Sequence, residues 1–238
     1  MRNSFCSTNL SSDFPKWSAW DAGLWISFRH HSIFSWVGDS RLFAYKFAYL
    51  EYNKDRISET ARQEGIPVLL LVGVIFNELG GMPERAKLFI VLPLYKIDDL
   101  IKGEGNNRSN KTSLGSTAMQ LRVAAETMGI DAEALTTTQQ LQLANCLLDD
   151  SFNINIVARH LRVLIKADNP NLKDYRILSE EQIIIAGSRY NRGMERKRED
   201  YVASIAAQEG DPIREYSSSG RTIMRRKEAF NNLFGINE

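Results

Sequence analysis

Hydrophobic and polar positions follow a helical period from Asn53 onward. The segment 53–65, NKDRISETARQEG, places Ile57 and Ala61 four residues apart on one face and ends on a glycine. An asparagine at the start and a glycine at the end are typical of helix caps. This segment therefore predicts a helix with Asn53 as its N-cap and a stop at Gly65.

The next segment, 66–81, is almost continuously apolar and ends on a single acid. It reads IPVLLLVGVIFNELGG. Pro67 suits a first turn, where its missing N–H costs no helical bond. A helix that is apolar on all sides belongs in the centre of a fold, and this one is too short to cross a bilayer, which takes about 20 residues. We predict a buried core helix from Pro67 to about Leu79 that carries Glu78 near its end.

Later segments repeat the helical pattern with less hydrophobicity. One helix is predicted over 116–128 and another in TTTQQLQLANCLLDD. In FNINIVARHLRVLIKA one stripe is apolar, so we expect that helix to pack by one face. The stripe consists of Ile154, Ala158, Leu161 and Ile165.

A last core helix is predicted in SEEQIIIAGSRYNRG. Ser179 and Gln182 have the spacing of a capping box, and Gly193 ends the pattern. No stretch alternates convincingly enough for a central sheet, and no repeat is evident. The pattern predicts a mainly α protein with one core.

Three regions differ in composition. Residues 1–52 hold all four tryptophans and many other aromatic residues; aromatic rings can stack on sugars, but we expect them to dock an N-terminal arm on the helical body. Residues 53–193 form the predicted core. Residues 194–238 form a charged C-terminal helical extension with an apolar stripe. That stripe consists of Ile223, Phe230, Leu233 and Phe234.

Within the core, residues 102–113 read KGEGNNRSNKTS. Glycine, asparagine and low hydrophobicity predict a mobile surface loop. Such a loop is either incidental or one wall of a cleft.

Composition narrows the classes of function. The chain has 238 residues, 43% of them hydrophobic, and its 30 basic and 29 acidic residues give a net charge of +1. No chain-wide field attracts nucleic acid or a membrane surface. We therefore expect no nucleic-acid partner and no membrane insertion.

The N-terminus and the cysteines indicate in which cellular compartment the chain is made and whether its thiols are oxidised. MRNSFCSTNLSSDFPKW lacks the apolar run of a signal peptide, so we expect a chain made in the cytoplasm. Cys6 and Cys146 lie far apart, with no Cys or His at metal-ligand spacing. We expect two free thiols, no metal site and no cofactor.

Glu78 is the candidate for chemistry. A carboxyl at the end of a buried helix is desolvated, and desolvation raises a carboxyl pKa toward the range of a general acid. Arg85 and Lys87 follow it and would pair with it if the chain folds back after Gly80. A protonated Glu78 suits glycosidic cleavage, because the leaving sugar oxygen needs a proton.

The segment ISETARQEGIPVLLLVGVIFNELGG resembles the opening of the lysozyme-like fold shared by goose-type lysozymes and soluble lytic transglycosylases. In those families a helix pair of this pattern delivers the catalytic glutamate, and Glu78 falls on it. The resemblance implies a lysozyme-like helical fold with a central buried helix that carries the acid.

Three later stretches follow in the family's order. SLGSTAMQ resembles the block that lines the cleft opposite the acid. NI at 155–156 resembles the start of a supporting helix, and AGSRYNRG resembles a block that orients the acid and the glycan. The residues thereby implied in substrate binding are Ser113, Gln120, Tyr190 and Asn191.

The chain also departs from the family pattern. Leu79 stands where a serine usually follows the glutamate, Ala118 where glycine is common, and Arg189 where a small residue often precedes Tyr190. These departures favour the alternative of a non-catalytic glycan-binding or structural module with a degenerate lysozyme-like fold.

A second carboxylate would decide the reaction. Asp98, Asp99 and Glu104 are the candidates for a base that activates water in an inverting hydrolase. Without one, the resemblance implies the lytic transglycosylase route, in which Glu78 acts as acid and then base while the sugar's own 6-hydroxyl attacks.

The leading expectation is a muramidase that cleaves peptidoglycan glycan strands between N-acetylmuramic acid and N-acetylglucosamine. A substrate outside the cytoplasm then requires delivery by a secretion machine or a phage-type release. A protein injected into rivals would require a protective immunity protein in the producing cell.

Overall fold

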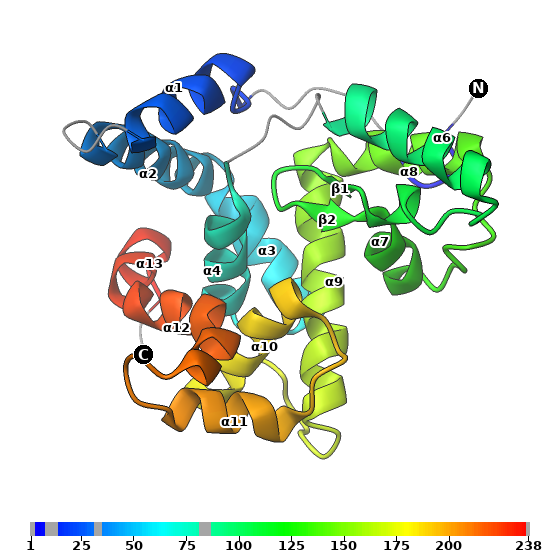
Figure 1. Ribbon diagram of the computed structural model, residues 1–238. Coiled ribbons are helices and arrows are strands. Elements are labelled where there is room, and N and C mark those ends of the chain that lie inside the picture. The colour runs from blue at the N-terminus through cyan, green and yellow to red at the C-terminus, as the bar shows by residue number, and fades with distance from the viewer. Residues whose placement is uncertain (1–2, 8–13, 31–34, 81–86, 237–238) are drawn as a thin grey trace. The chain divides into compact units, whose positions relative to one another are not determined.

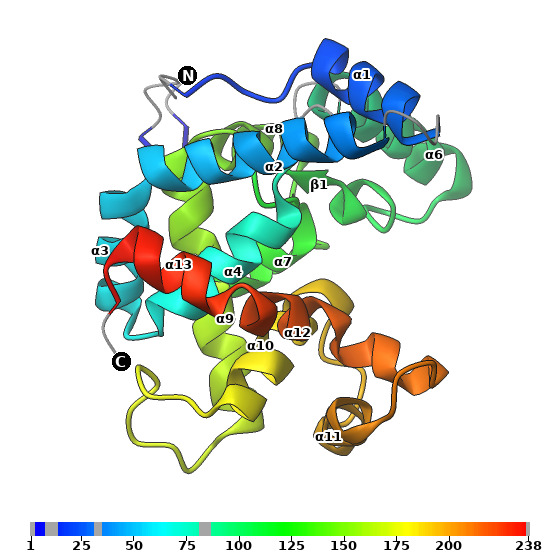
Figure 2. The same cartoon turned by 90° about the vertical axis from the view of Figure 1, so that its left-hand side faces the viewer.

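The computed structural model describes residues 3–7, 14–30, 35–80 and 87–236, apart from the side chains of residues 28–30 and 35–38 (Figures 1 and 2). These residues are mainly helical, as the periodicity predicts, with one small hairpin. None of the described helices is long and apolar enough to span a membrane.

The chain forms two compact units whose sequences interleave. The first combines Met1–Tyr52 with Glu78–Ile156, and the second combines Asn53–Asn77 with Val157–Glu238. The predicted boundary after residue 52 coincides with a unit boundary, whereas the predicted core 53–193 is divided between the two units.

The first unit contains the N-terminal helices and the hairpin, and α1 and α2 lie side by side in it (Figures 1 and 2). Its elements are α1 (Ala19–His30), α2 (Ser35–Tyr52), the π-helix η1 (Lys87–Val91), α6 (Leu92–Lys102), the 3-10 helix η2 (Ser109–Lys111), β1 (Ser113–Leu114), β2 (Met119–Gln120), α7 (Leu121–Thr127), α8 (Thr137–Leu147) and the start of α9 (Asp150–Asp168).

The second unit contains the rest of α9 and the helices of the C-terminal region, among which α10 and α12 pack together (Figure 1). Its other elements are α3 (Lys54–Glu64), most of α4 (Val68–Glu78), α10 (Glu180–Arg192), α11 (Arg198–Ala206), the 3-10 helix η3 (Pro212–Ser217), α12 (Ser218–Arg225) and α13 (Lys227–Phe234).

Helix α3 begins and ends where the sequence predicts, with Gly65 in the left-handed region. The expected cap is different, however. The Asn53 side chain makes no cap bond and instead accepts a hydrogen bond from Arg56. Ile57 and Ala61 are fully buried, as expected.

Helix α4 is buried around its whole circumference from Leu69 to Phe76, which confirms the predicted core helix. Gly73 lets α12 approach closely, because a side chain there would overlap Ile223. Gly220 of α12 does the same against the backbone of α10 at Ile184. The predicted apolar stripe of the C-terminal region thereby enters the core of the second unit.

The predicted stripe on α9 is confirmed. Ile154, Ala158, Leu161 and Ile165 are all at most 1% exposed. The capping box that starts α10 is also present, because the Ser179 side chain accepts from the Gln182 backbone while the Gln182 side chain accepts from the Ser179 backbone.

A buried ion pair joins the end of α9 to α10. Arg189 donates to both carboxylate oxygens of Asp168, at 2.5 and 2.7 Å, and the two side chains are 3% and 6% exposed. The guanidinium also donates to the carbonyls of Gly193 and Arg196 and lies over the ring of Tyr201. Arg189 therefore has a structural role between α9 and α10.

The predicted helix over 116–128 starts too early. Its N-terminal part is the β1–β2 hairpin, and α7 begins only at Leu121. Gly115 and Ala118 both have positive φ, at 77° and 50°, which a helix excludes.

The mobile-loop prediction for 102–113 is wrong in its physical basis. Asn106 and Asn110 are buried and bind backbone carbonyls of residues 132–135. Ser109 is fully buried and accepts a hydrogen bond from Gln140. These polar side chains, of a kind usually found in solvated loops, are buried here and satisfy the hydrogen-bonding groups of neighbouring segments.

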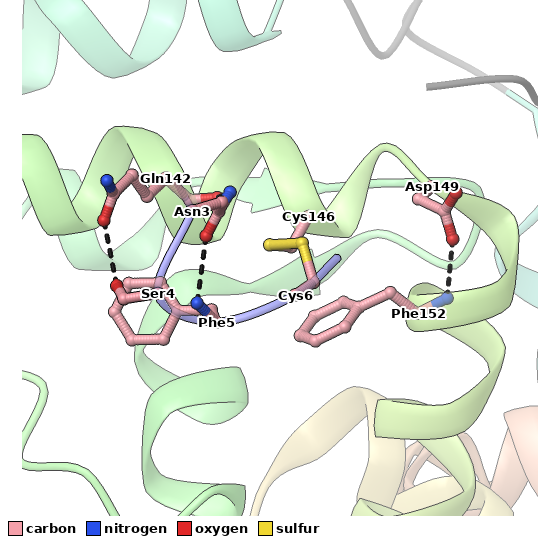
Figure 3. Close-up of a disulfide and its surroundings, with 8 residues drawn as sticks. All are labelled: Asn3, Ser4, Phe5, Cys6, Gln142, Cys146, Asp149 and Phe152. Carbon is pink, nitrogen blue, oxygen red and sulfur yellow. Dashed lines mark hydrogen bonds between the residues drawn. A yellow bond between two sulfur atoms is a disulfide. The ribbon is translucent and has the colours of Figure 1, made fainter. Parts of the chain in front are cut away.

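The prediction of two free thiols is also wrong. Cys6 and Cys146 form a disulfide that fastens the N-terminal segment to α8 (Figure 3). Asn3 and Ser4 add hydrogen bonds to Gln142 on the same helix. The bridge spans 140 residues of sequence, and a loop of that order stabilises a fold by about 4–5 kcal/mol in the chain-entropy model.

We predict that Asp168→Ala lowers the free energy of unfolding by about 3–5 kcal/mol, because it leaves the Arg189 guanidinium buried without its counter-ion. Denaturant unfolding followed by circular dichroism measures the change. The matched control is Asp174→Ala, which breaks an exposed pair with Arg176 and is expected to have little effect. Equal losses in the two variants would contradict a special role for the buried pair.

Candidate functional site

Glu78 is the last residue of α4 and lines a pocket in the first unit. The side chain is half-buried. The described lining also includes two aromatic residues, a lysine and a tight turn. These residues are Trp17, Tyr45, Gly80, Lys87, Gly115, Ser116 and Ala118.

The hairpin turn forms one wall of this pocket. The Thr117 backbone N–H and hydroxyl both donate to the Asn153 side chain, at 3.1 and 2.7 Å. Gly115 has no room for a side chain, because a Cβ there would overlap Leu147 and Asn153. Ala118 is held at a φ of 50°, which costs a non-glycine residue about 1–2 kcal/mol. Buried hydrogen bonds therefore fix a strained turn beside Glu78.

Asp150 lies behind this turn and is 3% exposed. One of its oxygens accepts from Lys16 at 2.5 Å, from Ser116 at 2.7 Å and from Tyr49 at 2.8 Å. Lys16 also donates to Ser116, at 2.8 Å. The N-terminal segment, α2 and the turn are thus joined through one buried carboxylate.

The aromatic part of the lining comes from the N-terminal segment and α2. The rings of Trp17 and Tyr45 lie 5.0 Å apart, and the Trp17 backbone N–H donates to the Tyr45 hydroxyl. Phe14 packs on Tyr45, Tyr49 and Tyr52, which share one face of α2.

The Trp17 indole is incompletely satisfied. Trp17 is 6% exposed, and its Nε1 has no hydrogen-bond acceptor among the described residues. A buried donor without a partner costs about 1–3 kcal/mol. The indole N–H is therefore one of the few unsatisfied polar groups described in the interior of the first unit.

The pocket is small. Its volume of about 10 Å³ is close to that of one water molecule, which needs roughly 10–15 Å³ by the same measure. A hydroxyl or carbonyl oxygen fits inside, whereas a sugar ring must lie over the mouth or shift a wall. The lining can hold one polar group between a carboxyl, a lysine and an aromatic pair.

Ser113 and Gln120, implied by the resemblance, lie opposite each other in the hairpin and are half-buried. They flank the turn that lines the Glu78 pocket, but neither belongs to its described lining.

Tyr190 and Asn191, also implied by the resemblance, lie at the end of α10 in the second unit. Tyr190 is half-buried against the ring of His160, and Asn191 is exposed. Burial lowers the pKa of His160 to about 4.

The three candidate second carboxylates lie elsewhere in the first unit. Asp98 pairs with Arg108 and Lys102, and the hydrogen bond from Arg108 is the main reason that its pKa lies below the usual range. Glu104 is exposed. Neither belongs to the described lining of the Glu78 pocket.

Asp99, the third candidate, is fully buried and accepts hydrogen bonds from the backbone N–H groups of Arg108 and Ser109. Burial acts to raise its pKa, but hydrogen bonds from Ser109 and Arg108 outweigh burial and hold the pKa below the usual value. Asp99 therefore fixes the 106–112 segment and is outside the described pocket lining.

The sequence pointed to Glu78 and to the SLGSTAMQ block, of which Gly115, Ser116 and Ala118 line the pocket, but it did not point to Trp17, Tyr45 or the contacts of Lys16 and Asp150. Trp17 and Tyr45 carried one signal, the aromatic density of residues 1–52, for which sugar stacking was the less favoured interpretation. Lys16 and Asp150 carried none, because their pairing spans 134 residues of sequence. Arg85, the other proposed partner of Glu78, lies outside the described residues.

The described residues contain no group of three or more His, Cys, Asp or Glu side chains that could hold a metal ion. Comparison with protein-family models, with curated proteins and with solved structures finds no match to this chain.

We predict opposite effects of exchanging glycine and alanine at the two ends of the turn. Gly115→Ala is expected to lower the free energy of unfolding by at least about 2 kcal/mol, because it adds steric overlap to an unfavourable backbone angle. Ala118→Gly is expected to be neutral or to stabilise by about 1 kcal/mol, since it removes strain while increasing the freedom of the unfolded chain. Thermal and denaturant unfolding measure both; destabilisation by Ala118→Gly would show that the turn is not strained.

We predict that the second unit loses stability as the pH falls from 6.5 to about 4. The folded pKa of His160 lies below the ordinary value of 6.5, so in this window the unfolded chain binds a proton that the folded chain does not. The free energy of unfolding therefore falls with decreasing pH, on the order of 2–3 kcal/mol in total. Denaturant unfolding between pH 7 and pH 4 measures this, with His160→Gln as the control. The same pH slope in both proteins would contradict the assignment.

Proposed function

We propose that this protein is a peptidoglycan-cleaving muramidase in which Glu78 is the general acid. The observation that carries the proposal is the position of Glu78, which ends a helix that is buried from Leu69 to Phe76 and lines a pocket with Ser116 and an aromatic pair. The acid protonates the bridging oxygen between N-acetylmuramic acid and N-acetylglucosamine, and the bond to the leaving sugar breaks.

Lys87 lines the same pocket as the half-buried Glu78 side chain. A general acid requires cleavage to decline as the pH rises through the pKa of this group, and a pH–rate profile measures that decline.

The resemblance to goose-type lysozymes and soluble lytic transglycosylases supplies the substrate class. It implies Ser113 and Gln120, beside the turn of the first unit, as glycan contacts. Tyr190 and Asn191, which it also implies, lie in the second unit at the end of α10. The pairing of Ser113 with Gln120 across the hairpin supports a common role for these two side chains.

The disulfide supports a destination outside the reducing cytoplasm. Such bonds persist in the periplasm and outside the cell, where peptidoglycan lies. We propose delivery by a secretion system or a phage-type release, and for an antibacterial toxin an immunity protein that protects the producer.

We predict that Glu78→Gln reduces the clearing of purified peptidoglycan at least 100-fold, since a positioned general acid contributes roughly 10²–10⁴-fold in rate. Turbidity of a peptidoglycan suspension measures the rate. Glu126→Gln, at an exposed acid of α7 outside the described lining, is the matched control and is expected to keep wild-type activity.

Equal clearing by wild type and Glu78→Gln, or clearing by neither, rejects the enzyme. Binding to peptidoglycan without cleavage would favour the alternative, a glycan-binding module with a degenerate lysozyme-like fold. Mass analysis of the sugar ends separates the two chemical routes, because hydrolysis leaves a reducing end and the transglycosylase route leaves a 1,6-anhydro ring.

A further inference from the structure

Helix α6 and the π-helix η1 before it carry apolar side chains on two faces (Figure 1). One face packs inward, and its residues Leu88 and Leu92 are buried. The other face holds six large apolar residues that are between 53% and 80% exposed, more than any other stretch of this length in the described chain. They are Phe89, Ile90, Leu94, Ile97, Leu100 and Ile101, and we call them the outer patch.

The outer patch is one continuous surface because its residues follow the helical period. Its central row is spaced by four, three and four positions, which places the residues on one face of a helix. Phe89 and Leu100 adjoin that face on one side. The π-helix η1 passes directly into α6 at Leu92, so the row runs along both elements. The central row consists of Ile90, Leu94, Ile97 and Ile101.

The outer patch is large for a surface that faces only solvent. Its six residues expose roughly 700 Å² in total, if about 180 Å² is taken as the full surface of one large apolar residue. The largest apolar patch of a typical monomer is about 300–600 Å², whereas one partner of a standard protein–protein interface contributes about 800 Å². The outer patch therefore has the size of one side of an interface.

The charges around the patch favour a protein partner over a membrane. Residues 89–108 contain three basic and three acidic side chains. Asp98 pairs with both Lys102 and Arg108, and Lys96 donates a hydrogen bond to Asn106. Helices that lie on an anionic membrane carry an excess of lysine and arginine beside their apolar face, and this segment has none.

The spacing of the central row is the spacing that contact with a second copy of this chain requires. Across a two-fold axis, residue i contacts residue j and residue j contacts residue i. The order four, three, four is the same in both directions along the chain. Two antiparallel copies would therefore bring Ile90 against the partner's Ile101 and Leu94 against the partner's Ile97, so that every pair in the row is apolar.

We propose that this protein forms a two-fold symmetric dimer through the outer patch of η1 and α6, with the two α6 helices antiparallel. The dimer does not depend on the proposed function, since it follows from the exposure, size, charge and spacing of the patch alone.

The test of the dimer is sedimentation velocity of the full chain over a wide range of concentration. The wild type is expected to approach twice the chain mass of 27.1 kDa as the concentration rises. Ile97→Glu places a charge at the centre of the row and is expected to raise the dissociation constant at least about tenfold. Ile177→Glu is the matched control, at an apolar residue of the second unit that is 75% exposed, and is expected to leave the constant unchanged.

Circular dichroism and the thermal midpoint establish that both variants are folded. A wild type that is monomeric at every concentration, or Ile97→Glu that associates as the wild type does, overturns the dimer. Flotation with phosphatidylglycerol vesicles examines the other occupant. Vesicle binding by a monomeric wild type that Ile97→Glu loses would assign the patch to a membrane surface and would also overturn the proposal.

Cross-linking tests the antiparallel arrangement. Both native cysteines are in the disulfide, so one added cysteine is the single free thiol of the chain. In the antiparallel pair, the two copies of position 97 lie about 5 Å apart along the helix axis and those of position 101 about 16 Å apart. A short bismaleimide is therefore expected to link Ile97→Cys into a covalent dimer severalfold faster than Ile101→Cys. Equal rates at the two positions would contradict the antiparallel pairing.

Discussion

The buried carboxylate of Asp150 is the constraint on which the arrangement of the first unit depends. It accepts hydrogen bonds from Lys16, Tyr49 and Ser116, which belong to three separate segments. A buried charge of this kind adds little net stability over an apolar replacement. Removing one partner, however, leaves the remaining groups buried without a hydrogen-bond or ion-pair partner, which strongly destabilises the fold. The contribution of Asp150 is therefore specificity of position: it aligns the N-terminal segment with the turn beside Glu78.

Other buried polar side chains of the first unit also hold one segment in position against another. Asp99 accepts hydrogen bonds from two backbone N–H groups of the 106–112 segment. Asn106 and Asn110 donate hydrogen bonds to backbone carbonyls of residues 132–135. In the second unit, Arg189 and Asp168 join α9 to α10. Each group is buried, and each is satisfied by a partner at a fixed distance, so these contacts select one arrangement of segments that hydrophobic packing alone would hold less specifically.

The local features of the fold could be predicted from the sequence, because apolar periodicity and caps act over a few residues. The stripe on α9, the capping box at Ser179 and the apolar helix α4 are of this kind. The predictions that were wrong concern features that depend on residues far away in the sequence. The β1–β2 hairpin was mistaken for helix because Ser116 and its neighbours adopt their conformation through buried contacts with α9. Glu78 could be selected as a candidate from its apolar surroundings. Trp17 could not, since its position depends on Tyr45, 28 residues away, and on the neighbouring contact of Lys16 with Asp150, 134 residues apart.

The disulfide has a topological consequence for any passage of this chain through a channel. With Cys6 joined to Cys146, more than half of the chain forms a closed covalent loop. Unfolding does not open such a loop, so any passage that admits a single extended strand excludes the oxidised chain even when it is denatured. Passage through a narrow channel thus requires Cys6 and Cys146 to be reduced, and the disulfide then forms after passage. A wide channel or release by cell lysis transfers the protein with its disulfide already formed.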